Sequence, residues 1–249
     1  MGNIIEEIII LMQFMTRLPV SFIKTVYTEE KLGKGIKYFP LVGAIIGGIL
    51  FSAFIFLGKF IENTLIISLV TVILEIFVVG VIHLDGLADT FDGLFSYASK
   101  ERILEIMKDS RIGTNGGIAL ILYFIGKILL MGEIASIDVK YILLYPVVSR
   151  ISTVMNAGLG EYARKDGMSN GIMKENGIGE VVFSLMLTAL LSFWIKGLKG
   201  LLILSVSVIF ILYFMNKVKR KIDGVTGDTM GACLELTSLV VLIGGVIIK

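Results

Sequence analysis

Residues 65–82 read LIISLVTVILEIFVVGVI, and the stretch HLDGLADTFDG follows directly at 83–93. The first stretch is almost wholly apolar and close to the roughly 20 residues that a membrane-spanning helix needs. The second stretch carries Asp85, Asp89 and Asp92 immediately beyond the apolar run. Together they predict a transmembrane helix with a cluster of carboxylates at its mouth.

The whole chain has the composition of an integral membrane protein. Of its 249 residues 55% are hydrophobic, and the mean hydropathy is +0.89. Apolar runs recur along nearly the whole length and leave no room for a separate soluble domain. We therefore predict an all-α fold, a polytopic integral membrane bundle that forms one transmembrane domain over residues 1–249.

Charge and residue usage exclude several kinds of partner and site. A net charge of +2, spread over several loops, argues against nucleic acid. One cysteine and one histidine cannot form a disulfide framework or a cluster of Cys and His metal ligands. Any metal bound here would have oxygen ligands.

Eight hydrophobic segments are candidate spans, which predicts about seven to eight crossings. The first is the weakest, because Glu6, Glu7 and Arg17 shorten its apolar core, so it also suits a helix lying in the membrane interface. The segments are residues 4–20, 38–58, 64–83, 117–137, 141–159, 180–195, 200–216 and 228–248.

The distribution of basic residues predicts the orientation. If all eight segments cross, fifteen Lys and Arg residues lie on one side and five on the other. The richer side also carries the long polar loops and the aspartates. We expect a multi-pass protein of the cell membrane, surrounded by lipid, whose polar site faces the cytoplasm.

The three aspartates share one face if residues 83–94 are helical, because a rotation of about 100° per residue places them within roughly 60° of arc. Three like charges so close repel one another unless a cation lies between them. Mg²⁺ commonly binds through a few carboxylates and substrate phosphate oxygens, so Asp85, Asp89 and Asp92 are candidate Mg²⁺ ligands. The alternative is a solvated acidic face. Gly86 and Gly93 would allow another helix or a ligand to approach closely.

Other polar residues are expected on the same side or at membrane depth. A short amphipathic helix is expected at 99–109, and a glycine-rich loop that opens a helix follows, which suits phosphate binding or merely a capped helix start. Glu75 lies within the 64–83 span, and on a continuous helix it would lie nearly opposite Asp85. We expect it to be a packing or pathway group. Further candidates are Asp109, Arg111, Thr114, Asn115, Arg150, Asp223, Asp228 and Glu235.

Three segments carry a family resemblance: HLDGLADTFDGLFS (83–96), ERILEIMKDSRIGTNGGIAL (101–120) and GVTGDTMGACLEL (224–236). They resemble the signature segments of the cobalamin synthases, the adenosylcobinamide-GDP ribazoletransferases, and the resemblance is collinear from about residue 12 to the C-terminus. It implies a polytopic membrane enzyme that joins adenosylcobinamide-GDP to α-ribazole or its 5′-phosphate and releases GMP with help from Mg²⁺.

The resemblance also implies roles for individual residues. The metal site falls on the three aspartates of 83–93. Asp92 and Asp228 are alternative proton acceptors for the attacking hydroxyl, and Arg111, with Arg150, would compensate phosphate charge. The expected substrate-binding residues are Asp109, Arg111, Thr114, Asn115, Arg150 and Asp223. Whether copies of the chain form a homo-oligomer stays open.

Two rival functions compete with this one. CDP-alcohol phosphotransferases use similar chemistry, but Ile82 stands where their first aspartate belongs and Asp89 where their arginine belongs. A cation or metabolite transporter could use Glu75, Asp85 and Glu235 as a relay. The concentration of carboxylates at one face favours an enzyme.

Overall fold

The computed structural model describes residues 2–20, 23, 25–164 and 167–248. Over these residues the predicted all-α fold is confirmed: the only extended pairing in the described part is an isolated bridge between Tyr162 and Val225. The helices are α1 (Gly2–Met15), α2 (Glu29–Gly35), the 3₁₀ helix η1 (Ile36–Tyr38), α3 (Phe39–Leu57), α4 (Thr64–Val79), α5 (Ile82–Leu94), α6 (Lys100–Ile106), α7 (Thr114–Ile137), α8 (Lys140–Leu159), α9 (Met168–Lys174), α10 (Ile178–Ile222) and α11 (Gly227–Ile247).

Helix α8 is the axis of the bundle. Nearly all of its side chains are buried, and α3, α10 and α11 pack directly against it. Glycines make one of these contacts close: a Cβ at Gly43 or Gly47 of α3 would lie only 2.3 or 2.5 Å from a backbone oxygen of α8. Small residues four apart commonly bring membrane helices together in this way.

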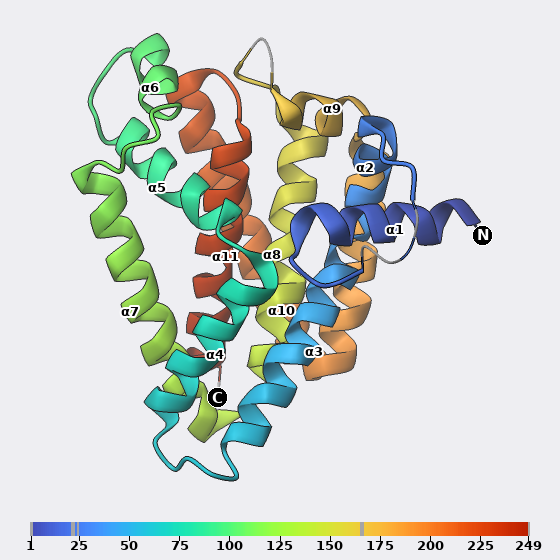
Figure 1. Ribbon diagram of the computed structural model, residues 1–249, viewed down its shortest axis with the longest axis vertical. Helices are drawn as coiled ribbons and strands as arrows, with labels where there is room; N and C mark the ends of the chain where they lie inside the picture. The colour runs from blue at the N-terminus through green and yellow to red at the C-terminus, as the bar shows by residue number, and fades with distance from the viewer. Residues whose placement is uncertain (1, 21–22, 24, 165–166, 249) are drawn as a thin grey trace.

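The long helices run roughly side by side, whereas α1 lies across them (Figure 1). With 14 residues, α1 is about 21 Å long, too short for the roughly 30 Å hydrocarbon core of a bilayer. The segment 4–20 therefore does not form a full-length spanning helix, and its geometry agrees with the interfacial alternative.

Among the described residues, five helices are long and apolar enough to cross a membrane, and α4 with α5 would make a sixth if the bent pair crosses as one span. Helix α10 counts once in this number, although its backbone is non-helical at Gly197. A Cβ at Gly200 would lie 2.2 Å from the carbonyl oxygen of Ser192, so the chain folds back there. Its two arms correspond to the spans predicted at 180–195 and 200–216.

The lipid-facing character of the bundle is visible in its side chains. Large apolar residues are exposed along α7 and α10, among them Leu122, Leu129, Leu190 and Ile209. Such a surface is unfavourable in water and suits a hydrocarbon environment. The chain is a multi-pass membrane protein.

The two ends of the bundle differ in character. Helices α2, α6 and α9 lie at one end, with α5 leading toward it (Figure 1). At the other end, Lys196 pairs with Asp138 at 2.5 Å and links two short connectors that the sequence places on one side. The candidate site residues gather at the first end, the polar end.

Candidate active site

A sharp bend separates α4 from α5 and decides where the aspartates lie. Gly80 has a φ of +84°, which side chains other than glycine rarely adopt, and its N–H donates to the carbonyl of Ile76 to close α4. The two helices differ in direction by 98°. The prediction of one continuous helix was wrong, so Glu75 and Asp85 do not lie on a common helix.

Helix α5 itself, at Ile82–Leu94, places the three aspartates along one face, as their spacing predicts. Asp85 is exposed, and Asp89 is half-buried. Neither carboxylate accepts a hydrogen bond from, or forms an ion pair with, a described residue. The charged groups that act on Asp89 come from α5, α11 and the loop before α9, namely Asp85, Asp92, Asp228 and Arg164.

Backbone contact between α5 and α11 brings Asp228 to these aspartates. A Cβ at Gly86 would lie 2.7 Å from the carbonyl oxygen of Asp228, and a Cβ at Gly231 would lie 3.1 Å from the Cα of His83. Gly93 admits the side chain of Met107 in the same manner. The predicted close approach at Gly86 and Gly93 is therefore confirmed.

Adding one methyl group at Gly86 should push α5 away from Asp228. We expect Gly86→Ala to lose about 1–3 kcal/mol of stability through overpacking and to lose activity as well. Gly126→Ala is the matched control, because nothing lies within 4 Å of a Cβ there. Thermal unfolding in detergent and turnover would be measured for both. A Gly86→Ala protein as stable and active as the control would contradict the close packing.

Asp228 is held by an arginine from a distant loop. Arg164 Nη2 donates to Asp228 Oδ2 at 2.7 Å, and both side chains are largely buried. Hydrogen bonds from Ala163 N to Val225 O and from Val225 N to Glu161 O fasten this loop to the turn before α11. The α11 start is itself fixed by a capping box between Thr226 and Thr229. Arg164 carries no local signal in the sequence, because 64 residues separate it from Asp228.

Asp92 is engaged elsewhere. Its two carboxylate oxygens accept from the backbone N–H of Gly113 (2.7 Å) and of Gly116 (2.9 Å), at the start of α7. A Cβ at either glycine would lie 2.4 Å from this carboxylate. The carboxylate therefore caps α7 and complements its dipole. This role competes with the metal and proton-acceptor roles predicted for Asp92.

The two roles of Asp92 can be separated by substitution. An asparagine amide has one acceptor oxygen and can keep one of the two N–H contacts without the charge, whereas alanine keeps neither. We expect Asp92→Asn to keep most of the turnover and Asp92→Ala to lose about 0.5–2 kcal/mol of stability. Unfolding and turnover of both variants would be compared. Complete loss of turnover in a stable Asp92→Asn protein would support the metal-ligand or proton-acceptor role of Asp92 instead.

The glycine-rich loop before α7 forms one wall of an open recess of about 360 Å³. Arg111 donates twice to the carboxylate of Asp109, which lowers the pKa of Asp109 to about 2. Thr114 and Asn115 are exposed at the first turn of α7. Asp92 already accepts hydrogen bonds from the backbone N–H groups of Gly113 and Gly116 in this loop. The phosphate-binding role of the loop therefore stays a prediction.

The predicted short helix between α5 and the glycine-rich loop is confirmed as α6, which begins after Ser99. Lys100 at its start pairs with the exposed Asp223 at 3.0 Å. Lys100, Lys108 and Arg164 line a second open recess of about 480 Å³. Glu101 and Glu105 line this recess too, so its wall carries charges of both signs.

Arg150 lies in the core instead of at the polar end. Its side chain is 1% exposed, donates to Ser149 Oγ at 3.1 Å and stacks over the ring of Phe39. Its Nε has no hydrogen-bond partner among the described residues. The substrate-binding role predicted for Arg150 receives no support from this placement.

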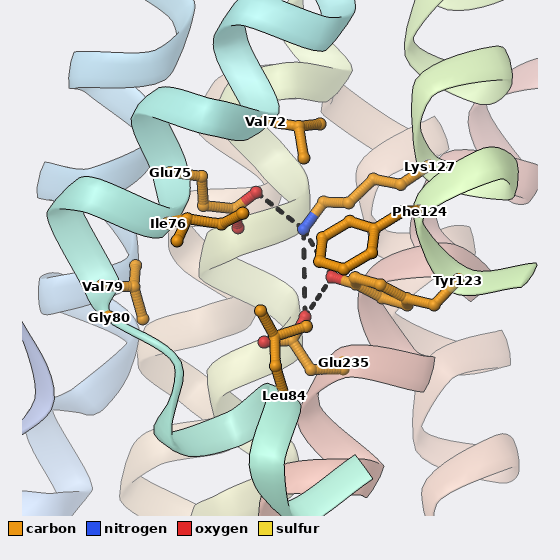
Figure 2. Close-up of a pocket in the computed structure, with 10 residues that line it drawn as sticks. All are labelled: Val72, Glu75, Ile76, Val79, Gly80, Leu84, Tyr123, Phe124, Lys127 and Glu235. Atoms are coloured by element: carbon orange, nitrogen blue, oxygen red, sulfur yellow. Dashed lines mark hydrogen bonds and ion pairs between the residues drawn. The ribbon is translucent and has the colours of Figure 1, made fainter. Parts of the chain in front are cut away.

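A buried ionic network joins α4, α7, α8 and α11 at membrane depth, and Figure 2 shows the part formed by Glu75, Tyr123, Lys127 and Glu235. Lys127 of α7 lies 2.7 Å from Glu75 of α4 and 3.9 Å from Glu235 of α11. Tyr123 donates to Glu235, and Tyr145 of α8 donates to Glu75 at 2.9 Å. The cavity between them measures only about 10 Å³, room for at most about one water molecule. Glu75 and Glu235 are thus packed groups, which disfavours the transporter relay.

Carboxylates on α5 are the candidate metal ligands, and their number near one point decides what they can hold. Within the described ranges, no three His, Cys, Asp or Glu side chains come close enough together to hold one ion. Mg²⁺ needs fewer protein ligands, since it usually keeps waters and takes one or two carboxylates plus substrate phosphates. The two unpartnered carboxylates, Asp85 and Asp89, fit that donor set, while Asp92 is already occupied.

Known proteins resemble this chain over nearly its whole length. The family profile described as cobalamin-5-phosphate synthase matches residues 7–246. An adenosylcobinamide-GDP ribazoletransferase of Fusobacterium nucleatum subsp. nucleatum is 40% identical, with 93% of this chain and 94% of that protein covered. Proteins of the same name from Caldanaerobacter subterraneus subsp. tengcongensis (96% and 97% covered) and Clostridium novyi (96% and 95% covered) are each 37% identical. No solved structure matches significantly. The chain belongs to the cobalamin-5-phosphate synthase family.

Proposed function

We propose that this chain is an adenosylcobinamide-GDP ribazoletransferase, which joins adenosylcobinamide-GDP to α-ribazole or its 5′-phosphate and releases GMP. Support comes from family membership over nearly the whole chain. The single structural observation that carries the proposal is the pair of unpartnered carboxylates, Asp85 and Asp89, beside the Arg164–Asp228 ion pair. Carboxylates facing an arginine suit a metal-assisted transfer of a phosphoryl group.

The reaction moves one phosphoryl group. A hydroxyl oxygen of the ribazole ribose bonds to the cobinamide-linked phosphorus, and the bond from that phosphorus to the bridging oxygen of the diphosphate breaks. GMP leaves with the bridging oxygen, and the hydroxyl proton passes to a base. Such transfers depend mainly on positioning and on compensation of charge.

The residues divide these tasks by position. Asp85 and Asp89 would hold Mg²⁺, which supplies positive charge to the diphosphate when bound. Asp228 is the better placed proton acceptor of the two predicted, because both oxygens of Asp92 already accept N–H groups. Arg164 would orient Asp228 and offset phosphate charge. The recess lined by Lys100 and Lys108 would take the nucleotide end of the diphosphate substrate.

Product analysis tests this proposal. The purified protein in lipid is given adenosylcobinamide-GDP and α-ribazole, and chromatography with mass spectrometry follows GMP and the corrinoid. We expect one GMP for each cobalamin formed, and no GMP when α-ribazole is omitted. GMP release without an acceptor would indicate hydrolysis, and no product from folded protein would contradict the proposal.

The orientation is also proposed: the polar end faces the cytoplasm. The native Cys233 is completely buried, so it contributes little background to thiol labelling. Ser110→Cys at the polar end and Glu62→Cys at the other end are both at exposed positions. An impermeant maleimide applied to intact cells should label Cys at 62 and not at 110. The reverse pattern would invert the orientation.

A further inference from the structure

A second cavity lies where α1, α5, α8, α9 and α11 meet. It encloses about 260 Å³, and its walls are mainly apolar. Phe14, Met15, Ile172 and Met230 form this apolar lining. The size lies just below the 300–1,000 Å³ typical of pockets for drug-sized ligands. A corrinoid cannot enter such a space, whereas a compact ligand fits it.

Two buried polar side chains on this cavity have no partner. His83 is 7% exposed and Thr153 is 4% exposed, and both line the cavity. His83 Nδ1 and Thr153 Oγ1 make no hydrogen bond in the described part of the chain, and neither does the buried Nε of Arg164. Buried polar atoms are nearly always paired, and an unpaired one destabilises the fold. Three such atoms around one space indicate a ligand that pairs with them.

The cavity opens toward the reacting centre. Asp228 and Arg164 line one part of it. On α5, Ile82, Gly86 and Asp89 follow one another at helical spacing on one stripe. Ile82 lines the cavity and Gly86 touches the backbone of Asp228, so Asp89 lies one further turn along toward the polar end. A ligand in the cavity would therefore present its outer end to Asp228, beside Asp89.

We propose that this cavity binds the acceptor nucleoside, with its flat nitrogen heterocycle among the apolar side chains and its ribose toward Asp228. The proposal rests on the proposed function, in which the acceptor is a benzimidazole riboside. An apolar heterocycle with a few hydrogen-bonding atoms matches apolar walls with a few unpaired polar atoms. Among the described lining residues, the charged pair Arg164 and Asp228 neutralise each other, so these walls suit an uncharged heterocycle. The anionic corrinoid substrate is left to the open polar end.

Thr153 provides the test, because its hydroxyl can be removed or replaced by bulk. Thr153→Val deletes the hydroxyl at nearly constant shape, and Thr153→Leu adds volume at the cavity wall. Thr188→Val is the matched control, since the Thr188 hydroxyl is buried and bonded to Ser184 O within α10. For each full-length protein in lipid, calorimetry measures binding of α-ribazole alone, and turnover gives KM for both substrates.

We expect Thr153→Val to weaken α-ribazole binding about tenfold, the effect of one lost hydrogen bond, and to raise KM for α-ribazole equally. Thr153→Leu should weaken binding further, while KM for adenosylcobinamide-GDP and the control protein stay at wild-type values. Unchanged α-ribazole binding in both Thr153 variants overturns the inference, as does an equal rise of both KM values. If wild-type protein binds α-ribazole but forms no cobalamin, the proposed function fails while the cavity assignment is still tested by the binding data.

Discussion

Asp89→Asn is expected to lower kcat by ~10²–10³-fold or more, a loss comparable to removing one preorganised electrostatic stabiliser from an active site. Asp89 is half-buried, has no hydrogen-bond or ion-pair partner in the described chain, and lies in range of Asp228 and Arg164. Asparagine keeps the shape and removes the charge that would hold Mg²⁺. We expect a loss of similar size from Asp85→Asn, because the two carboxylates would share the ion.

These two variants should be folded. Neither carboxylate supports another side chain, so thermal unfolding in detergent should match that of the wild type. Asp138→Asn, at the opposite end of the bundle, is the control for an aspartate change as such and should keep normal kcat. Normal turnover in both Asp85→Asn and Asp89→Asn would contradict a metal site at these two residues.

Lys127→Met is expected to be the most damaging change to stability. Lys127 is 2% exposed and is the cation between Glu75 and Glu235. Its loss leaves two buried carboxylates without a counter-charge, and breaking a buried ion pair in this way costs about 3–5 kcal/mol. Unfolding by SDS titration would measure the loss. Lys219→Met, which removes an exposed cation paired with Glu161 at 3.4 Å, should cost much less.

A rescue variant shows whether charge is the cause. Changing Glu75 and Glu235 to glutamine together with Lys127→Met removes all three charges and keeps most of the volume. Neutral replacements of buried ionic groups are often tolerated, so stability should be largely regained. If the triple variant is as unstable as Lys127→Met alone, the network contributes through packing instead of charge compensation.

The sequence predicted the elements of the fold better than their connections. Periodicity and spacing correctly placed the aspartates of α5 on one face, and apolar length identified the long helices. The bend at Gly80 gave no such signal, because the apolar run continues through Val81 and Ile82 and a glycine inside a membrane helix is ordinary. The charges of the first segment predicted that it is the weakest span, and the interfacial alternative agrees with the way α1 lies across the long helices.

Contacts between distant residues could not be read from any local pattern. Asp92 has the same helical spacing as its neighbours, yet Gly113 and Gly116 capture its carboxylate from more than twenty residues away. Arg164 reaches Asp228 only because a backbone bridge at Tyr162 and Val225 brings the two loops together. Glu75 and Glu235 stood out as polar residues in apolar segments, but their pairing with Lys127 follows from helix packing.

GMP release by the purified protein, first with Mg²⁺ and then with EDTA, shows whether the transfer needs a metal ion held by Asp85 and Asp89. The substrates are adenosylcobinamide-GDP and α-ribazole, and the protein is held in lipid. We expect GMP formation to require Mg²⁺, to stop with EDTA and to return when Mg²⁺ is added in excess. Undiminished GMP formation in EDTA would contradict it, because Asp85 and Asp89 would then have no metal to hold.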